Sequence, residues 1–329
     1  MKHFTLADRE ILKDLLQRGM SYRGIGQRLN KSHTSISDEV KRNKSSAGQY
    51  RSIEAHKKAF CRKNQRKKRT KLEISPGLKI YIVQKILCEQ WSPEQIDRVL
   101  RIKSGGTVVI SHESIYQFIY SPEGRKLKLY QYLRRKKKPI RQSFGTRKKR
   151  FIIRDRVSIH RRYEKINKRQ EFGHWETDLM IFSNQKFVLA VTVERLSRYT
   201  IATILPNKTA IEMKQALYRV ILDSGQQNVK SITFDNGTEN VLHHELKHEF
   251  PELETYFCDP YCSWQKGLVE NTNGLLRQYF PRSIDLGRLS QRDMDITVSK
   301  INNRPRKCLR FTTPSLAFSL LSQNGRFNT

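Results

Sequence analysis

The spacing of apolar residues changes at Phe172, and this change constrains the fold more than any other feature of the sequence. Before Phe172 the apolar residues recur at helical intervals, whereas after it they alternate with polar residues or form β-branched runs, which is typical of strands. The runs 172–181, 187–193 and 199–205 predict three strands of an antiparallel meander. The chain therefore divides into an all-α amino-terminal part and an α/β carboxyl-terminal part.

A helix and a fourth strand follow the meander. Thr209 is placed to cap an amphipathic helix that ends near Gly225, and Val229–Phe234 returns as a strand. Three strands, a helix and a further strand predict an RNase H-like α/β core.

Charge is distributed unevenly along the chain. The formal net charge is +33, from 64 lysines and arginines against 31 acids, and residues 1–150 hold 38 of the bases and 12 of the acids. Such an excess points to a polyanionic partner, above all a nucleic acid. The densest basic runs, 62–71, 134–138 and 147–150, are interpreted as linkers or arms that follow phosphates, with an ordinary solvated segment as the alternative for each run.

Several protein classes are excluded. The longest apolar run, Phe187–Val193, is far shorter than the roughly 20 residues that a membrane-spanning helix requires. Met1–Glu10 is too polar for a signal peptide, and the five cysteines are too scattered for a disulfide framework. We therefore expect no membrane partner and a reducing, cytoplasmic location.

The first 44 residues have the pattern of a helix-turn-helix. A helix is predicted over 6–17, Ser21 can cap a second, and Ser32 can cap a recognition helix over 33–42. A plain three-helix bundle would have the same spacing, so the surrounding charge favours the DNA-binding interpretation. The residues expected near base edges or phosphates are His33, Thr34, Ser35, Ser37, Asp38, Lys41, Arg42 and Lys44.

A second helix-turn-helix is predicted further along the chain. Residues 78–89 are amphipathic, and helices are predicted to begin at the Trp91–Ile96 and Ser111–Tyr120 segments. The aromatic side chains in these segments are interpreted as core packing rather than as platforms for base stacking. Two such modules would suit a long or composite DNA site.

Three acids occupy suggestive positions in the carboxyl-terminal part. Asp178 lies inside the first predicted strand, Asp235 ends the fourth, and Glu270 falls on a helix predicted over 267–279. Each acid alone would be read as a surface charge or a cap, but together they form the oxygen-rich set that Mg²⁺ prefers. The residues Lys266, Glu270, Asn273 and Arg277 share one face of this helix.

Two other motifs partly match the patterns of zinc sites. His244–His248 matches the H-E-x-x-H pattern of zinc proteases, but Pro251 follows almost at once and Lys247 lies where such enzymes need apolar packing. Cys258 and Cys262 lack a nearby second pair for a zinc site. We interpret the cysteines as reduced and structural.

Several blocks of the sequence resemble the DDE transposases of the insertion sequence thirty family. These blocks are Trp91–Ile96, Ser111–Tyr120, Trp175–Asp178, Thr233–Glu239, Tyr261–Pro281 and Asn302–Pro314, together with the amino-terminal helix-turn-helix. The resemblance implies a retroviral-integrase-like fold in which Asp178, Asp235 and Glu270 form a metal-binding catalytic triad. It also implies two Mg²⁺ ions, for which Mn²⁺ is expected to substitute. Thr177, where many relatives have glycine, and Leu268–Val269 depart from the family pattern without touching a carboxylate.

The expected organisation is a multidomain chain. The predicted parts are a first helix-turn-helix domain at 1–60, a second at 72–125, a basic linker at 126–168, and an RNase H-like catalytic domain with carboxyl-terminal helices at 169–329. The expected activity is cleavage and joining of double-stranded DNA at the element's terminal inverted repeats and a target, by a bacterial, nucleoid-associated homo-oligomer. The alternatives are a sequence-specific repressor with a non-catalytic RNase H-like oligomerisation domain and a structure-selective nuclease.

Further residues are candidates for contact with DNA or with the triad. Lys266, Asn273 and Arg277 are expected to orient phosphates or the carboxylates, and Trp264 to stack at a DNA end. A packing or capping role is an equal alternative for each. His174 is a weaker candidate for a group that supports the triad.

Overall fold

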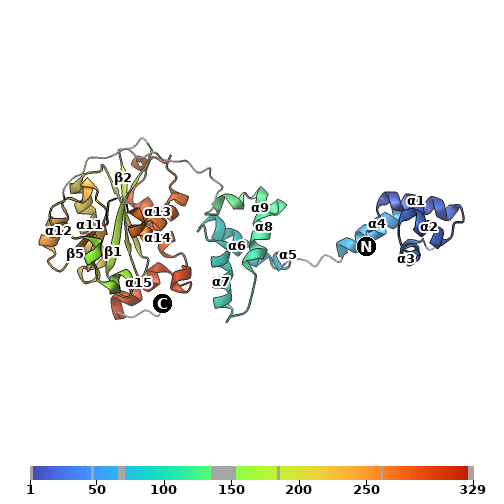
Figure 1. The fold of residues 1–329 in the computed structure, drawn as a ribbon, viewed down its shortest axis with the longest axis horizontal. Coiled ribbons are helices and arrows are strands. Elements are labelled where there is room, and N and C mark those ends of the chain that lie inside the picture. Colours follow the sequence, from blue (N-terminus) through green and yellow to red (C-terminus); the bar gives the residue numbers. More distant parts are fainter. Residues whose placement is uncertain are drawn as a thin grey trace. The chain divides into compact units, whose positions relative to one another are not determined.

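A computed structural model describes residues 3–45, 48–65, 71–134, 153–183, 186–260 and 262–324. The chain forms two compact units, Met1–Pro76 and Gly77–Thr329 (Figure 1). The helices of the second predicted helix-turn-helix thus fall largely in the same unit as the sheet, although the sequence separated 72–125 from 169–329.

The first unit is helical. It contains α1 (Leu6–Gln17), α2 (Tyr22–Leu29), α3 (His33–Asn43), α4 (Ser52–Gln65) and α5 (Lys71–Ile74). The helices predicted over 6–17 and 33–42 are confirmed. Helix α4 was not predicted, and it includes the start of the basic run 62–71.

Caps set the starts of the first three helices. The Thr5 hydroxyl accepts a hydrogen bond from the backbone N–H of Asp8, and the Asp8 carboxylate accepts one from Thr5, which completes a capping box. Ser21 and Ser32 cap α2 and α3 in the same way. The apolar faces of these helices then meet in a small core of Leu12, Leu15, Ile25, Ile36 and Val40.

A buried arginine joins three of these helices. Arg9 on α1 is 5% exposed, and its Nε lies 2.6 Å from a carboxylate oxygen of Glu39 on α3. Its guanidinium also lies 3.2 Å from Nδ1 of His56 on α4. Because an unpaired buried charge is costly, these partners fix how α1, α3 and α4 pack.

The turn between α2 and α3 requires a glycine at position 26. A Cβ at Gly26 would lie 2.6 Å from the carbonyl oxygen of Lys31. We predict that Gly26→Ala lowers the free energy of unfolding of this unit by about 1–3 kcal/mol, because backbone must move to relieve the overlap. Denaturant unfolding measures the effect. Gly24→Ala in the same helix is the control, because its Cβ would meet first the flexible Met20 side chain, at 3.2 Å; an equal loss in the control would contradict the explanation.

The second unit begins with a helical module. It consists of α6 (Pro76–Leu87), which starts at the unit boundary, α7 (Pro93–Lys103), α8 (His112–Tyr120), α9 (Pro122–Lys126) and the 3-10 turn η1 (Leu129–Tyr132). Ser92 and Gln95 form a capping box at the start of α7, with a proline at its first position. Buried Asp97 on α7 accepts a hydrogen bond of 3.2 Å from the backbone N–H of His112. This bond ties the start of α8 to α7.

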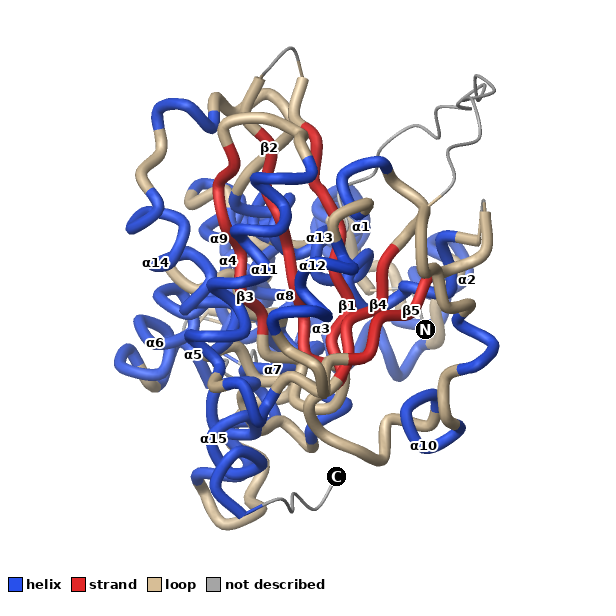
Figure 2. The backbone as a smooth tube through the Cα atoms, turned by 90° about the vertical axis from the view of Figure 1, so that its left-hand side faces the viewer, coloured by secondary structure: helices blue, strands red, loops and turns tan. Residues whose placement is uncertain are grey.

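A five-stranded mixed sheet forms the centre of the second unit. Its strands are β1 (His174–Ile181), β2 (Val188–Glu194), β3 (Thr200–Leu205), β4 (Ser231–Phe234) and β5 (Glu254–Phe257), in the order β3-β2-β1-β4-β5 (Figure 2). The first three strands are antiparallel, as the meander predicted, and β1, β4 and β5 are parallel. The four-residue strand β5 was not predicted.

Helices cover both faces of this sheet (Figure 1). Helices α11 (Ala210–Ser224) and α12 (His243–Glu249) pack on one face around Trp175, and α13 (Gly267–Tyr279) and α14 (Gln291–Asn302) pack on the other around Val191. Helix α15 (Pro314–Asn324) places Phe318 against the first cluster. The remaining short elements are η2 (Ile159–Arg161), α10 (Glu164–Asn167), η3 (Gln226–Asn228), η4 (Thr238–Asn240), η5 (Ser263–Lys266), η6 (Leu286–Arg288) and η7 (Lys307–Leu309).

Part of the segment expected as a basic linker packs against the sheet. Ile153 joins the α11 cluster, and Arg156 donates hydrogen bonds to Asn236 and to the carbonyl of Cys258. The basic runs expected at 134–138 and 147–150 lie outside the described residues, except for Arg134, as does 66–70 of the first run. Within the described ranges, no helix is both long and apolar enough to cross a bilayer.

Candidate active site

Two of the three predicted carboxylates lie on one strand and directly after its parallel neighbour. The register of β1 and β4 pairs Glu176 with Thr233. Asp178 lies two residues further along β1, and Asp235 directly follows β4. Both carboxylates therefore lie toward the same end of this strand pair, where ligand groups commonly collect in sheets of this kind.

The Lys266 ammonium group lies between these two carboxylates. Its Nζ is 3.1 Å from Oδ1 of Asp178 and 3.6 Å from Oδ2 of Asp235, and it donates a hydrogen bond of 2.9 Å to the carbonyl of Thr177. Lys266 is only 4% exposed. Burial alone would lower the pKa of this lysine, but the negative charges of Asp235 and Asp178 outweigh burial and raise it above its ordinary value. The lysine is therefore charged at neutral pH.

The environment between Asp178 and Asp235 is suited to a divalent cation. The donors that converge there are hard carboxylate oxygens, and the ammonium group shows that a positive charge is accommodated between them. Asn273 adds an amide that contacts Asp178. The residues present thus fit a Mg²⁺ site once Lys266 moves aside.

A tight turn holds Asp235 in place. Its Oδ1 accepts hydrogen bonds from the backbone N–H of Gly237 at 3.2 Å and from the Asn240 amide at 2.8 Å. A Cβ at Gly237 would lie 2.4 Å from the carboxyl group of Glu239, which is 5% exposed. A larger residue at position 237 would therefore require the Glu239 carboxyl group to shift.

Helix α13 is anchored to β1 at its first two turns. The backbone N–H of Val269 donates a hydrogen bond of 3.2 Å to Oε2 of Glu176, and the Asn273 amide donates one of 2.8 Å to Oδ2 of Asp178. Glu270 is exposed and lies four residues after Lys266 and three before Asn273, so it shares their side of the helix.

The structure does not gather the three carboxylates into one ligand cluster. Within the described part of the chain, no group of three or more histidine, cysteine, aspartate or glutamate side chains is arranged to hold a metal ion. Glu270 has no hydrogen bond or ion pair with the described residues, whereas Asp178 and Asp235 are both engaged by Lys266. The assignment of all three as metal ligands therefore stays a prediction.

A buried ion pair that the sequence analysis missed lies beneath the site. Glu176 is 1% exposed and forms a salt bridge with Arg195, which is 4% exposed and also donates to the carbonyl of Ile166 at 3.2 Å. Nearby Arg162 has its pKa lowered to about 10 by burial and then by the positive charge of Arg195. The sequence contained a signal that could have found Glu176. Side chains alternate between the two faces of a strand, so Glu176 must lie on the same face of β1 as Asp178.

The other candidates in this unit have different surroundings. Arg277 donates a hydrogen bond of 2.7 Å to the carbonyl of Ile181, and its guanidinium lies 4.2 Å from the ring centre of Phe182. Trp264 is 71% exposed and so is free to meet a ligand. His174 is buried, and burial lowers its pKa to about 4. Its Nδ1 lies 2.7 Å from the Ser231 hydroxyl and its Nε2 lies 3.6 Å from the Glu171 carboxylate, and among the described contacts it has none with Asp178, Asp235 or Glu270.

The predicted recognition helix presents most of its candidates to solvent. The exposed side chains are His33, Thr34, Asp38, Lys41, Arg42 and Lys44, and those of Ser35 and Ser37 are half-buried. Ser35 lies 2.8 Å from the hydroxyl of Ser32, so it takes part in the cap of α3. Nearly all of this face of α3 is therefore available to a partner.

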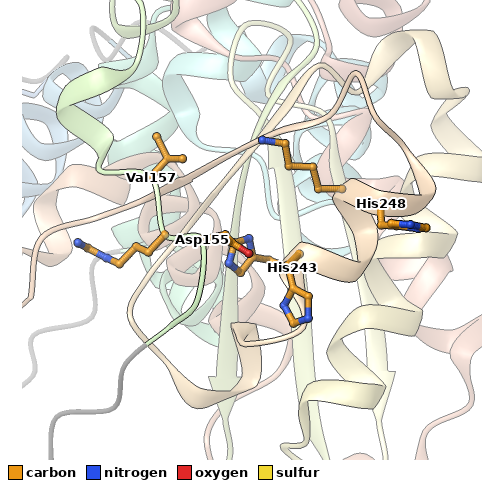
Figure 3. Close-up of a pocket in the computed structure, with 7 residues that line it drawn as sticks. Asp155, Val157, His243 and His248 are labelled. Carbon is orange, nitrogen blue, oxygen red and sulfur yellow. The ribbon is translucent and has the colours of Figure 1, made fainter.

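The H-E-x-x-H motif lies in α12, beside a pocket of about 540 Å³ between α12 and residues 155–157 (Figure 3). Glu245 is paired with Lys214 at 2.8 Å, and the Nδ1 of His244 lies 2.9 Å from the carbonyl of Val241. These two side chains are therefore engaged within the helix and its packing. All five cysteines are free.

We predict that Lys266→Met increases the affinity of the site for Mg²⁺. The change removes the cation that competes for Asp178 and Asp235; a charged hydrogen bond is worth about 1.5–3 kcal/mol, so the affinity should rise roughly ten- to hundredfold. Thermal unfolding at increasing Mg²⁺ concentration measures this, because a ligand of the folded state raises the melting temperature. Lys300→Met on α14, where the lysine is exposed, is the control; equal shifts in both variants would contradict the competition.

Comparisons with known proteins agree with this architecture. The helix-turn-helix domain family matches residues 1–43, and the integrase core domain family matches residues 168–263. Together with the mixed sheet, these matches confirm the expected fold class, an amino-terminal helix-turn-helix followed by an integrase-like α/β domain. Among solved structures, the catalytic core domain of BIV integrase is 19% identical, covers 47% of this chain and 99% of that chain, and has a TM-score of 0.37.

Curated relatives cover almost the whole sequence. The transposase InsI for insertion sequence element IS30A of Escherichia coli (strain K12) is 37% identical over 319 residues, which are 95% of this chain and 82% of that protein. The transposase for insertion sequence element IS4351 of Bacteroides fragilis is 34% identical over 326 residues, 98% of both chains. On these similarities, the chain belongs to the insertion sequence thirty (IS30) family of transposases.

Proposed function

We propose that this transposase binds the terminal inverted repeats of its own element and catalyses Mg²⁺-dependent cleavage and transfer of DNA strands. One observation supports the proposal most directly: Asp178 and Asp235, on adjacent parallel strands, converge on a buried cation. Helix α13, which bears Glu270, is anchored beside them.

The three carboxylates would hold the metal. Asp178, Asp235 and Glu270 would each supply carboxylate oxygens to the Mg²⁺ ions, of which we expect two. Bound divalent cations would offset the negative charge that builds up on the phosphate in the transition state. Lys266, once displaced from the carboxylate pair, would bind the phosphate of the strand being cut, and Asn273 would hold Asp178.

The chemistry consists of two displacements at phosphorus. In the first, the oxygen of a water molecule forms a bond to phosphorus and the bond to the 3′ oxygen breaks, which leaves a 3′-hydroxyl and a 5′-phosphate. In the second, that 3′-hydroxyl attacks a phosphodiester of the target, whose own 3′ oxygen leaves and takes up a proton. Each phosphodiester bond that breaks in the second step is replaced by a new one.

DNA would contact several parts of the chain. The exposed side chains of α3 would read bases and contact phosphates, while Trp264 and Arg277 are candidates for contacts at the DNA end. Two paired element ends suit a symmetric assembly, so we propose that the working form is a homodimer or a larger assembly. We propose that the protein acts in the bacterial cytoplasm, on the nucleoid.

A cleavage assay tests this proposal. A labelled duplex carrying the element's terminal repeat is incubated with the protein and either Mg²⁺ or EDTA. We expect a single nick at the element end, which leaves a 3′-hydroxyl that terminal transferase can extend, and no nick in EDTA. Tight binding without a nick in Mg²⁺ or in Mn²⁺ would instead favour the sequence-specific repressor.

A further inference from the structure

The helical module and the sheet domain are joined by contacts between segments about 200 residues apart in sequence. The Tyr279 hydroxyl at the end of α13 donates a hydrogen bond of 2.9 Å to the carbonyl of Glu89. The Gln95 amide donates one of 2.6 Å to the carbonyl of Pro305, and Lys307 lies 2.7 Å from Glu94. We call this set of contacts, between residues 89–95 and residues 278–307, the dock.

Arg304 is at the centre of the dock. It is 3% exposed, and burial lowers its pKa to about 10. Its Nε donates a hydrogen bond of 3.0 Å to the side-chain oxygen of Gln95, and its NH1 donates one of 3.0 Å to that of Gln278. A buried guanidinium needs hydrogen-bond acceptors, and one of its two side-chain acceptors comes from the helical module. Separation of the module would therefore leave Arg304 without this partner.

The Gln95 side chain both caps α7 and contacts the sheet domain. Its side-chain oxygen accepts both from the backbone N–H of Ser92, which completes the capping box of α7, and from Arg304. Its amide nitrogen donates to Pro305. The Trp91–Ile96 block, interpreted from the sequence as the start of a DNA-reading helix, thus also meets the Asn302–Pro314 block of the sheet domain.

Docking through the first turn of α7 leaves the first turn of α8 open. Glu113 and Tyr116 are exposed, and half of the His112 side chain is accessible. Asp97 fixes the start of α8 to α7 through its hydrogen bond to the backbone of His112. The position of α8 is thereby coupled, through α7 and the dock, to the domain that carries Asp178 and Asp235.

We propose that the dock makes the helical module a rigid spacer, which holds DNA contacted by α8 at a fixed distance from the carboxylates. In this view the contacts at residues 89–95 determine where the strand is cut, and the unit Met1–Pro76 contributes affinity for DNA. The role of the dock in placing the cut rests on the proposed function.

Two native cysteines provide reporters on either side of the dock. Cys88 precedes Glu89, Cys308 follows Lys307, and both are exposed. Cys61 and Cys262 are first replaced by serine, so that nitroxide labels attach to Cys88 and Cys308 in the full chain. Cys258 is kept, because it is buried and does not react with the label. Pulsed electron resonance then gives the distribution of distances between the two labels.

The key variant is Gln95→Ala combined with Tyr279→Phe, and the matched control is Ser92→Ala. The control removes the cap of α7 but leaves the contacts of Gln95 with Arg304 and Pro305 in place. We expect one narrow distance distribution for the unmodified dock and the control, and a distribution at least twofold broader for the double variant. If the distance distribution were as broad in the protein with the unmodified dock as in the double variant, the proposal that the dock holds the module rigidly would be overturned.

The position of the nick tests the spacer role separately. On terminal-repeat DNA we expect one cut position with the control and several neighbouring positions with the double variant. A single unchanged position despite a broadened distance distribution would overturn the spacer role. A chain that cuts nothing would instead contradict the proposed function, while the distance measurement would still decide whether the dock exists.

Discussion

Replacing Asp235 by asparagine is expected to reduce strand cleavage by at least about a thousandfold while leaving the binding of terminal-repeat DNA nearly unchanged. Asparagine has the same shape, and its side-chain oxygen can still accept from Gly237 and Asn240, so the turn after β4 should persist. What is lost is one of the two negative charges that attract a cation between Asp178 and Asp235. The effect should therefore fall on catalysis rather than on folding or DNA affinity.

Parallel measurements of nicking and of DNA binding distinguish a role of Asp235 in catalysis from a role in folding or in DNA affinity. The matched control is Asp223→Asn, an exposed aspartate near the end of α11, which should cut at the rate of the unmodified protein. If Asp235→Asn weakened binding and cleavage by the same factor, its assignment as a metal ligand would be refuted. The result would then point to a structural role for the turn.

The second large effect is expected at the buried pair of Glu176 and Arg195. Removing one partner of a buried ion pair typically costs about 3–5 kcal/mol, because the other charge is left without compensation. Arg195→Met should therefore lower the melting temperature of the Gly77–Thr329 unit by roughly 6–20 °C. Both residues are at most 4% exposed, so solvent cannot replace the lost contact.

A variant that removes both charges of this pair distinguishes their effect on stability from the role of Glu176 in positioning α13. Glu176→Met with Arg195→Met removes both charges, so much of the stability should return. The backbone N–H of Val269 would still lose its acceptor, and the start of α13 would lose an anchor to β1. We therefore expect a folded protein with impaired cleavage. Recovery of both stability and cleavage would contradict the positioning role of Glu176.

An exposed ion pair serves as the control for this experiment. Arg288 lies 3.3 Å from Asp285, and its side chain is 87% exposed. Such pairs contribute little because water and salt screen them, so Arg288→Met should change stability by less than about 1 kcal/mol. Thermal unfolding followed by circular dichroism measures all four proteins in the same way.

Local signals predicted much of the fold and of the site. Ser32 and Thr209 mark helix starts because their side chains satisfy the first free N–H groups, and the runs that became β1 to β3 show the alternation or β-branched content of strands. The order of Asp178, Asp235 and Glu270 along these elements predicts a catalytic site, and the described contacts bring Asp178 and Asp235 together on Lys266 but leave the role of Glu270 a prediction. Such features depend on residues within one or two turns of each other.

Features that depend on distant partners could not be predicted in this way. Lys266 was placed on the correct helical face, but nothing local shows that its ammonium group lies buried between two aspartates. Strand β5 has only four residues and exists because it pairs with β4. Arg304 and Gln95 meet only when the helical module packs on the sheet domain, so neither sequence block indicates the other. Tertiary contacts decide such cases.

The most direct test of the account is a strand-transfer assay. A labelled duplex that ends in the element's terminal repeat with a free 3′-hydroxyl is mixed with supercoiled target DNA, the protein and Mg²⁺. The account predicts covalent joining of the labelled strand to the target, which is absent in EDTA and with Asp235→Asn. Efficient Mg²⁺-dependent nicking without any joined product would contradict it, because the chain would then be a nuclease rather than an enzyme that transfers strands.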